Sequence, residues 1–203
     1  MKDNSIHLSE NVIIADADYI DHVAFELTVN FERVLGRRVP KADLSQWIVD
    51  IALDGGLRAD GRDHETQVVL VHDGTHGQLD NFVPSDFDSE LDGKAFRDER
   101  LGEFIINAYK ADVVDKNDYI ADVVRTVFSH DEVKRLMVVT NADIGEVPVS
   151  VAAALSGAGA FSGRVTVFAM QPVRGNFAQE ILGYSLMNAL GIRADEIEAA
   201  SNG

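Results

Sequence analysis

The chain has 203 residues, 46% of them hydrophobic, a formal net charge of −16 and no cysteine. That length and apolar content suit one folded domain and exclude a largely disordered chain. The absence of cysteine excludes disulfides, thiolate metal ligands and a cysteine nucleophile, and favours a reducing compartment. No apolar run approaches the roughly 20 residues that span a bilayer, and no signal-peptide pattern opens the sequence. We therefore expect a cytoplasmic protein without a membrane partner.

Strands and helices are predicted in alternation from the first apolar run onward. A buried strand is predicted at residues 12–15 and a helix at 20–35, ended by the glycine that follows. A second helix follows Pro40, and residues 68–71 form the next strand. The Gly- and Asp-rich segment 72–100 is predicted to be a long insertion loop, of a length that is usually functional or mobile.

The second half of the chain repeats this alternation. It predicts strands at 104–109, 136–139 and 164–169, and helices at 115–128, 147–155 and 177–190. Continuously apolar strands between helices indicate a three-layer α/β sandwich with a mostly parallel, Rossmann-like sheet of about five strands. No repeat or linker divides the chain, so residues 1–203 are expected to form a single domain. The first few residues and residues 199–203 lack an apolar period, and we expect them to be unfolded.

Acidic residues follow two of the predicted core strands. Asp16 and Asp18 come after the first strand and Asp143 after the fourth, and ligands of parallel sheets bind beyond such strand ends. Asp118 and Asp122 are four residues apart and share one side of a predicted helix. Carboxylates gathered at one edge suit Mg²⁺ or Mn²⁺, and two such ions can clamp a phosphodiester displacement. The alternative is that these residues only cap helices and form turns.

The order of these segments resembles a known family. An apolar strand ends in Asp16, residues 110–115 lead into a helix with acidic residues, and a later strand ends in Asn141-Ala142-Asp143-Ile144. Over residues 10–170 this resembles the NYN branch of PIN-like nucleases, whose late strand ends in Ser-Gly-Asp-x-Asp-Phe.

The resemblance implies a metal-dependent ribonuclease. The implied catalytic residues are Asp16, Asp118, Asp122 and Asp143, and the implied ligands of Mg²⁺ or Mn²⁺ are Asp16, Asp18, Asp122, Asn141 and Asp143. Asn141 departs from the family because it stands where the first late Asp is expected, and losing that charge lowers the affinity for a metal ion. A degenerate, non-catalytic domain that binds a partner or forms an oligomer is therefore a second hypothesis.

A second resemblance implies a different enzyme. Asp16-Ala17-Asp18-Tyr19-Ile20 is similar to the start of haloacid-dehalogenase-type phosphatases, and residues 138–141 are similar to their second motif. In such an enzyme Asp16 would be the nucleophile, Asp18 the general acid/base and Thr140 a phosphate binder. Residues 169–172, after the fifth strand, lack the acidic pair that holds Mg²⁺ in this family.

One dense basic cluster is present. It comprises Arg33, Arg37, Arg38 and Lys41. Such a cluster could steer single-stranded RNA toward the acidic edge, although a negative net charge repels nucleic acid on average. Its alternative role is to place favourable charge at a helix carboxyl end.

Overall fold

The computed structural model describes residues 8–157 and 163–201, and the expectation of an unfolded amino end falls on residues 1–7, outside this part. The main sheet contains β1 (Asn11–Asp16), β3 (His64–His72), β5 (Lys94–Asp98), β6 (Gly102–Lys110), β7 (Arg135–Val139), β8 (Val165–Ala169) and β9 (Ala178–Ile181). A small second sheet pairs β2 (Ala42–Asp43) with β4 (Phe82–Val83). The helices are α1 (Ala17–Leu35), α2 (Leu44–Asp54), α3 (Lys116–Phe128), α4 (Val149–Gly157), α5 (Leu182–Ala189), α6 (Ala194–Ser201) and a π-helical turn, η1 (Phe87–Leu91).

The main sheet has the strand order β5-β6-β3-β1-β7-β8-β9. Only β5 is antiparallel to its neighbour. Numbered along the chain, the six parallel strands have the order 3-2-1-4-5-6, that of doubly wound Rossmann-like folds. The predicted α/β class with a mostly parallel sheet is therefore confirmed.

The expected number of about five strands is wrong, because this sheet contains seven. The additional strands are β5, inside the predicted loop 72–100, and β9, inside the predicted helix 177–190. Both are edge strands with mostly polar, half-buried or exposed residues, so neither has the apolar run by which a core strand is recognised. The expected unfolded tail is also partly wrong, since α6 extends to Ser201.

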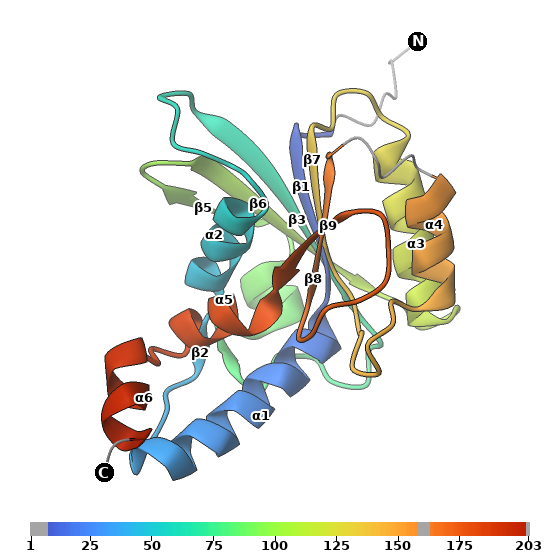
Figure 1. Ribbon diagram of the computed structural model, residues 1–203. Coiled ribbons are helices and arrows are strands. Elements are labelled where there is room, and N and C mark those ends of the chain that lie inside the picture. The colour runs from blue at the N-terminus through green and yellow to red at the C-terminus, as the bar shows by residue number, and fades with distance from the viewer. Residues whose placement is uncertain (1–7, 158–162, 202–203) are drawn as a thin grey trace.

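Helices cover both faces of the sheet, as Figure 1 shows. Ile13 and Ala15 of β1 face the core formed with α1, α2 and α5, whereas Val12 and Ile14 face the core formed with α3 and α4. Successive side chains of a strand point to opposite faces, so a strand buried on both must be apolar throughout. This explains the continuous apolar run at residues 12–15.

β1 continues directly into α1. The Asp16 carboxylate caps the helix by accepting a hydrogen bond from the Tyr19 N–H at 3.0 Å. At the other end Gly36 has a φ of 63° and donates its N–H to the Glu32 carbonyl, which ends the helix where the sequence predicts. No loop separates strand from helix, so Asp16 and Asp18 are fixed rigidly at the edge of the sheet.

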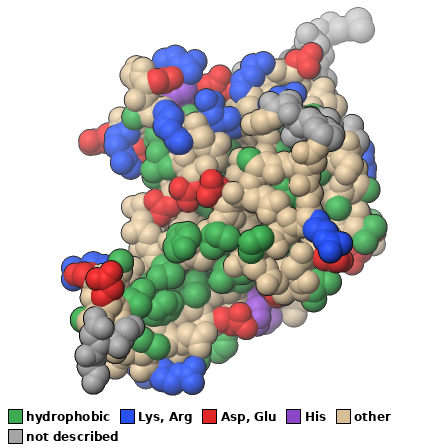
Figure 2. Space-filling view, in the orientation of Figure 1, with side chains coloured by type: hydrophobic (Ala, Val, Ile, Leu, Met, Phe, Trp, Pro, Cys, Tyr) green, Lys and Arg blue, Asp and Glu red, His purple; other side chains and the backbone are tan. Residues whose placement is uncertain are grey.

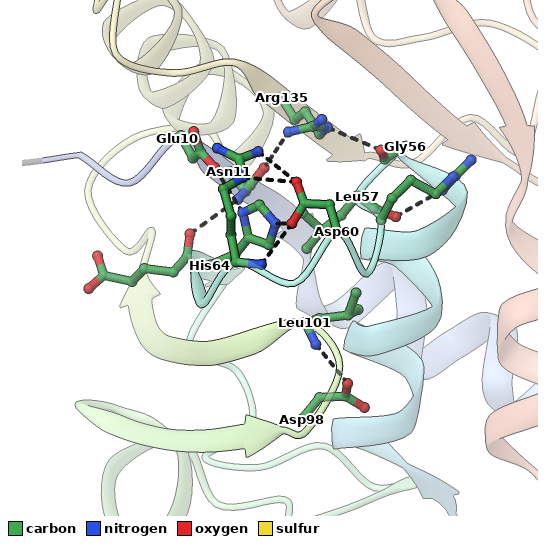
Figure 3. Close-up of polar contacts among 12 residues, drawn as sticks. Glu10, Asn11, Gly56, Leu57, Asp60, His64, Asp98, Leu101 and Arg135 are labelled. Atoms are coloured by element: carbon green, nitrogen blue, oxygen red, sulfur yellow. Dashed lines mark hydrogen bonds and ion pairs between the residues drawn. The ribbon is translucent and has the colours of Figure 1, made fainter.

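A polar cluster ties together the amino ends of the strands (Figure 3). The His64 side chain is only 2% exposed, with Nδ1 2.9 Å from Glu10 Oε1 and Nε2 2.9 Å from Asp60 Oδ1. Beside it, Arg135 of β7 donates to the Asn11 side-chain oxygen at 3.2 Å. The carboxyl edge, where ligands bind in such folds, lies at the opposite end of the strands.

Within residues 8–157 and 163–201, no helix is long and apolar enough to cross a membrane.

Candidate functional site

The strand order reverses at β1 and β7, so a crevice is expected beyond their carboxyl ends. A cavity of about 380 Å³ lies there. Its polar lining consists of Asp16, Lys116, Asn117, Asn141 and Glu146, and its apolar lining of Ile144, Val147, Pro148 and Val149. The lining therefore comes from the end of β1, the start of α3 and the segment that leads from β7 into α4.

An ion-pair triad stands at the head of this cavity. The Lys116 ammonium, at the first position of α3, lies 2.8 Å from Asp16 Oδ1 and 2.6 Å from Asp18 Oδ2. The Asp73 N–H also donates to Asp18 Oδ2, at 2.9 Å. The triad thus joins three neighbouring elements of the sheet edge.

Burial and charge act against each other in the triad. Burial raises the pKa of Asp16, and the nearby Lys116 ammonium offsets this only in part. Burial would lower the pKa of Lys116, but Asp16 and Asp18 outweigh it, and the pKa of Lys116 is raised. Lys116 is therefore held as a cation between the two carboxylates, in the position where a divalent ion was expected.

Two buried polar atoms near Asp16 lack a hydrogen-bond partner among the described residues: Thr140 Oγ1 and Asn117 Oδ1. Thr140 directly follows the Ala15–Val139 register pair, so it lies opposite Asp16 on the same face of the sheet. Burial raises the pKa of Tyr19, and the nearby Asp143 carboxylate raises it further. Buried polar groups are normally satisfied, so these atoms indicate a place for water or a ligand.

Asn141 and Asp143 lie in the turn after β7 and are exposed. The Asn141 side-chain oxygen accepts the Asp143 N–H at 3.2 Å, and Gln171 donates to the Asp143 carbonyl at 3.1 Å. Asn141 lines the cavity with Asp16, and Asp143 stands beside Tyr19. These two predicted residues are therefore brought to the same edge as Asp16.

Asp118 and Asp122 are not brought into this cavity. Both are exposed, and Asp122 is paired with Arg125 and lines a different groove along α3. At 3.6 residues per turn, Asp118 lies about 200° around the helix from Lys116. The expectation that these two acids share the edge with Asp16 is corrected, because it is the first residue of α3 that faces Asp16.

The residues present do not fit a divalent ion while Lys116 occupies the space between Asp16 and Asp18. Across 8–157 and 163–201, no group of three or more His, Asp or Glu side chains is arranged to hold a metal ion. The role of Mg²⁺ or Mn²⁺ stays a prediction.

Over residues 5–197 the sequence matches the model of a family described as "Family of unknown function (DUF6621)". The chain belongs to this family. No curated protein and no solved structure matches it. Membership of DUF6621 assigns no chemistry, so the function of the chain has to come from its site.

In this DUF6621 chain, part of the segment predicted as an insertion loop forms a wall of the site. Residues 73–81 line a second cavity, of about 550 Å³, on the other side of Asp18. Asp21 fastens this segment by accepting hydrogen bonds from the Asn81 N–H at 2.8 Å and from its side chain at 3.0 Å. This part of the insertion therefore lies at the carboxyl edge of the sheet.

The basic cluster lies far from the triad. Arg33, Arg37, Arg38 and Lys41 lie at or beyond the carboxyl end of α1, and a 19-residue helix is about 28 Å long. Arg37 forms two hydrogen bonds with Glu196, at 3.0 and 2.8 Å, and Arg38 pairs with Glu32. This placement favours a structural role for Arg37 over steering of RNA toward Asp16.

Sequence reasoning missed Lys116, because a single lysine at a helix start is usually solvated. The sequence could nevertheless have indicated where Lys116 lies, because it is the first residue of the helix that precedes β7, and β7 pairs with β1.

Proposed function

We propose that this protein is a PIN-like binding domain that does not cleave phosphodiesters with divalent ions. The observation that carries the proposal is the contact of the Lys116 ammonium with both Asp16 and Asp18. An internal cation neutralises the carboxylates that would otherwise attract a metal ion. Displacing Lys116 is costly, because it leaves the buried Asp16 carboxylate without its counter-ion.

The remaining acids support the same proposal. Asn141 supplies no charge where the PIN-like pattern has an aspartate, and Asp118 and Asp122 lie outside the cavity. A clamp of two metal ions needs several carboxylates converging on one point. The described side chains bring only Asp16 and Glu146 into the cavity as acids.

The lining of the cavity indicates the kind of ligand it would hold. The carboxamides of Asn117 and Asn141 can donate and accept hydrogen bonds, and Ile144 and Val149 are 85% and 87% exposed. Lys116 is already paired with Asp16 and Asp18, so the cavity offers a phosphate group no unpaired cation among the described residues that line it. We therefore expect an uncharged polar ligand with an apolar portion, bound between the carboxamides and the rim.

Incubation of the purified chain with labelled single-stranded RNA and Mn²⁺ tests the absence of cleavage. We expect no product beyond the amount formed with Asp16→Asn. Cleavage by the wild type that Asp16→Asn abolishes would overturn the proposal and restore the nuclease hypothesis.

A phosphatase of the haloacid-dehalogenase type is the second candidate, and the unpartnered Thr140 hydroxyl beside Asp16 favours it. Asp16 would attack phosphorus and displace the leaving-group oxygen, which Asp18 would protonate, and water would then hydrolyse the aspartyl-phosphate. Thr140 would bind a phosphate oxygen. Such an enzyme would release phosphate from p-nitrophenyl phosphate and lose this activity with Asp16→Asn and with Thr140→Val. Equal, background-level release by all three proteins would exclude this candidate.

A further inference from the structure

A second candidate binding site lies along α3 and shares no lining residue with the triad. On this face of the sheet α3 lies over β1 and β3. A groove with a volume of about 460 Å³ runs between α3 and the neighbouring strands β3 and β6. This size is within the usual range of small-molecule sites. We call it the tyrosine groove and define it by Gln67, Val69, Asn107, Tyr109, Tyr119 and Val123.

Two tyrosines stand at one end of the groove. Tyr109 ends the groove side of β6 and is 43% exposed, and Tyr119 is half-buried in the first turns of α3. Burial raises the pKa of Tyr119, and Tyr109, which lines the same groove, raises it further. Val69 and Val123 supply apolar surface beside the rings. Aromatic rings at the edge of an apolar slot are suited to stacking on a flat ligand.

Two carboxamides on the floor provide hydrogen-bonding groups. The β3–β6 register pairs Val69 with Asn107. Gln67 lies two residues before Val69 on β3, so Gln67 and Asn107 point to the same face of the sheet. The Asn107 side chain has no hydrogen bond within the described residues, while Gln67 accepts the Ser9 N–H at 3.4 Å. A carboxamide both donates and accepts, as the edge of a nucleobase does.

The charge of the groove limits what can occupy it. Among the residues that the structure describes, no lysine or arginine lines it, and Asp122, which is paired with Arg125, is its one charged residue. With a net charge of −16, the chain also repels anions at longer range. A ligand with a phosphate is therefore disfavoured relative to its uncharged counterpart.

We propose that the tyrosine groove binds a planar heteroaromatic ring of the nucleobase type, in a nucleoside rather than a nucleotide. The ring stacks against Tyr109 and Tyr119, and the Asn107 carboxamide binds its polar edge. The site uses none of the residues of the triad, so it stands independently of the function proposed for Asp16 and Lys116.

Calorimetric titrations of the four ribonucleosides and their 5′-monophosphates into the full chain test this site. We expect at least one nucleoside to bind saturably, and more tightly than its monophosphate. Tyr119→Ala should weaken binding about tenfold, since stacking on an aromatic side chain contributes on this scale. Asn107→Leu should have an effect of about the same size, because it removes the hydrogen bonds of the carboxamide. Tyr184→Ala is the matched control, because Tyr184 is 71% exposed on α5 and lies outside the groove.

Circular dichroism and thermal unfolding establish that each variant is folded, and Tyr119→Phe, which keeps the ring, should retain binding. Three results would overturn the proposal: no saturation by any nucleoside at millimolar concentration, tighter binding of the monophosphate, or equal binding by wild type, Tyr119→Ala and Asn107→Leu.

Discussion

Asp16 ends β1, caps α1 and pairs with Lys116, and each of these contacts constrains its carboxylate. The cap needs an oxygen acceptor at this position, which asparagine also provides. The ion pair with Lys116 needs a negative charge, which asparagine lacks. Burial makes that charge costly, and such a cost is typical of residues kept for function.

Replacing Asp16 by Asn separates these contributions. Because the pKa of Asp16 is raised in the folded protein, its contribution to stability is present below the unfolded value and is lost as the pH rises through the folded value. The Asp16→Asn variant has no carboxyl group to ionise at this position, so it does not lose stability in this way. Its side-chain oxygen still caps the helix. We expect the stability at neutral pH to change by no more than about 1 kcal/mol.

Urea unfolding at acidic and neutral pH measures this effect. The free energy of unfolding of the variant, relative to the wild type, should be higher at neutral pH than near pH 4. A relative stability that falls from acidic to neutral pH would contradict the raised pKa, because the ion pair with Lys116 would then outweigh the cost of burying the Asp16 charge.

The elements of the sheet show how far the sequence alone predicts this structure. Core strands such as β1 and β7 are predicted because both faces are buried, which leaves a continuous apolar run. The edge strands β5 and β9 are not, because pairing to one neighbour requires no such run. The cluster of acids was only partly predicted, since spacing along α3 does not reveal which side of the helix faces β1.

The start of β3 depends on the buried His64 and its two carboxylate partners. His64→Leu would leave Glu10 and Asp60 facing an apolar side chain without their shared donor. We expect a loss of about 1 kcal/mol in the free energy of unfolding, the usual net contribution of a hydrogen bond, because both carboxylates are partly exposed and Asp60 keeps its contacts with Arg62.

His76→Leu serves as a control, since His76 is exposed, and should leave the stability within about 0.5 kcal/mol of wild type. Chemical denaturation of both variants makes the comparison. Equal stability of His64→Leu and His76→Leu would contradict a structural role for the cluster at the amino end of the sheet.

At the scale of the molecule, the two ends of the sheet differ in design. The amino ends of the strands are closed by paired polar groups, whereas the carboxyl ends open into two cavities that share the triad between them. Hydrophobic side chains gather over α1 and α5 (Figure 2), and the expectation of an oligomer stays a prediction.

The long-range contact between Arg37 and Glu196 fastens α6 to the end of α1. Arg37→Ala should increase amide hydrogen exchange in residues 194–201 and leave β1 unchanged, because the contact is local to this end of the molecule. Exchange followed by mass spectrometry measures both segments. Unchanged exchange in α6 would show that apolar packing alone holds this helix.

The claim that Lys116 takes the place of a metal ion is tested most directly by calorimetric titration of Mn²⁺ into the wild type, Lys116→Met and Lys110→Met. Lys110 is an exposed lysine outside the triad and controls for the loss of one positive charge. We predict no saturable binding to the wild type or Lys110→Met, and saturable binding to folded Lys116→Met, in which Asp16 and Asp18 have lost their internal cation. Saturable binding to the wild type, or none to folded Lys116→Met, would contradict this claim.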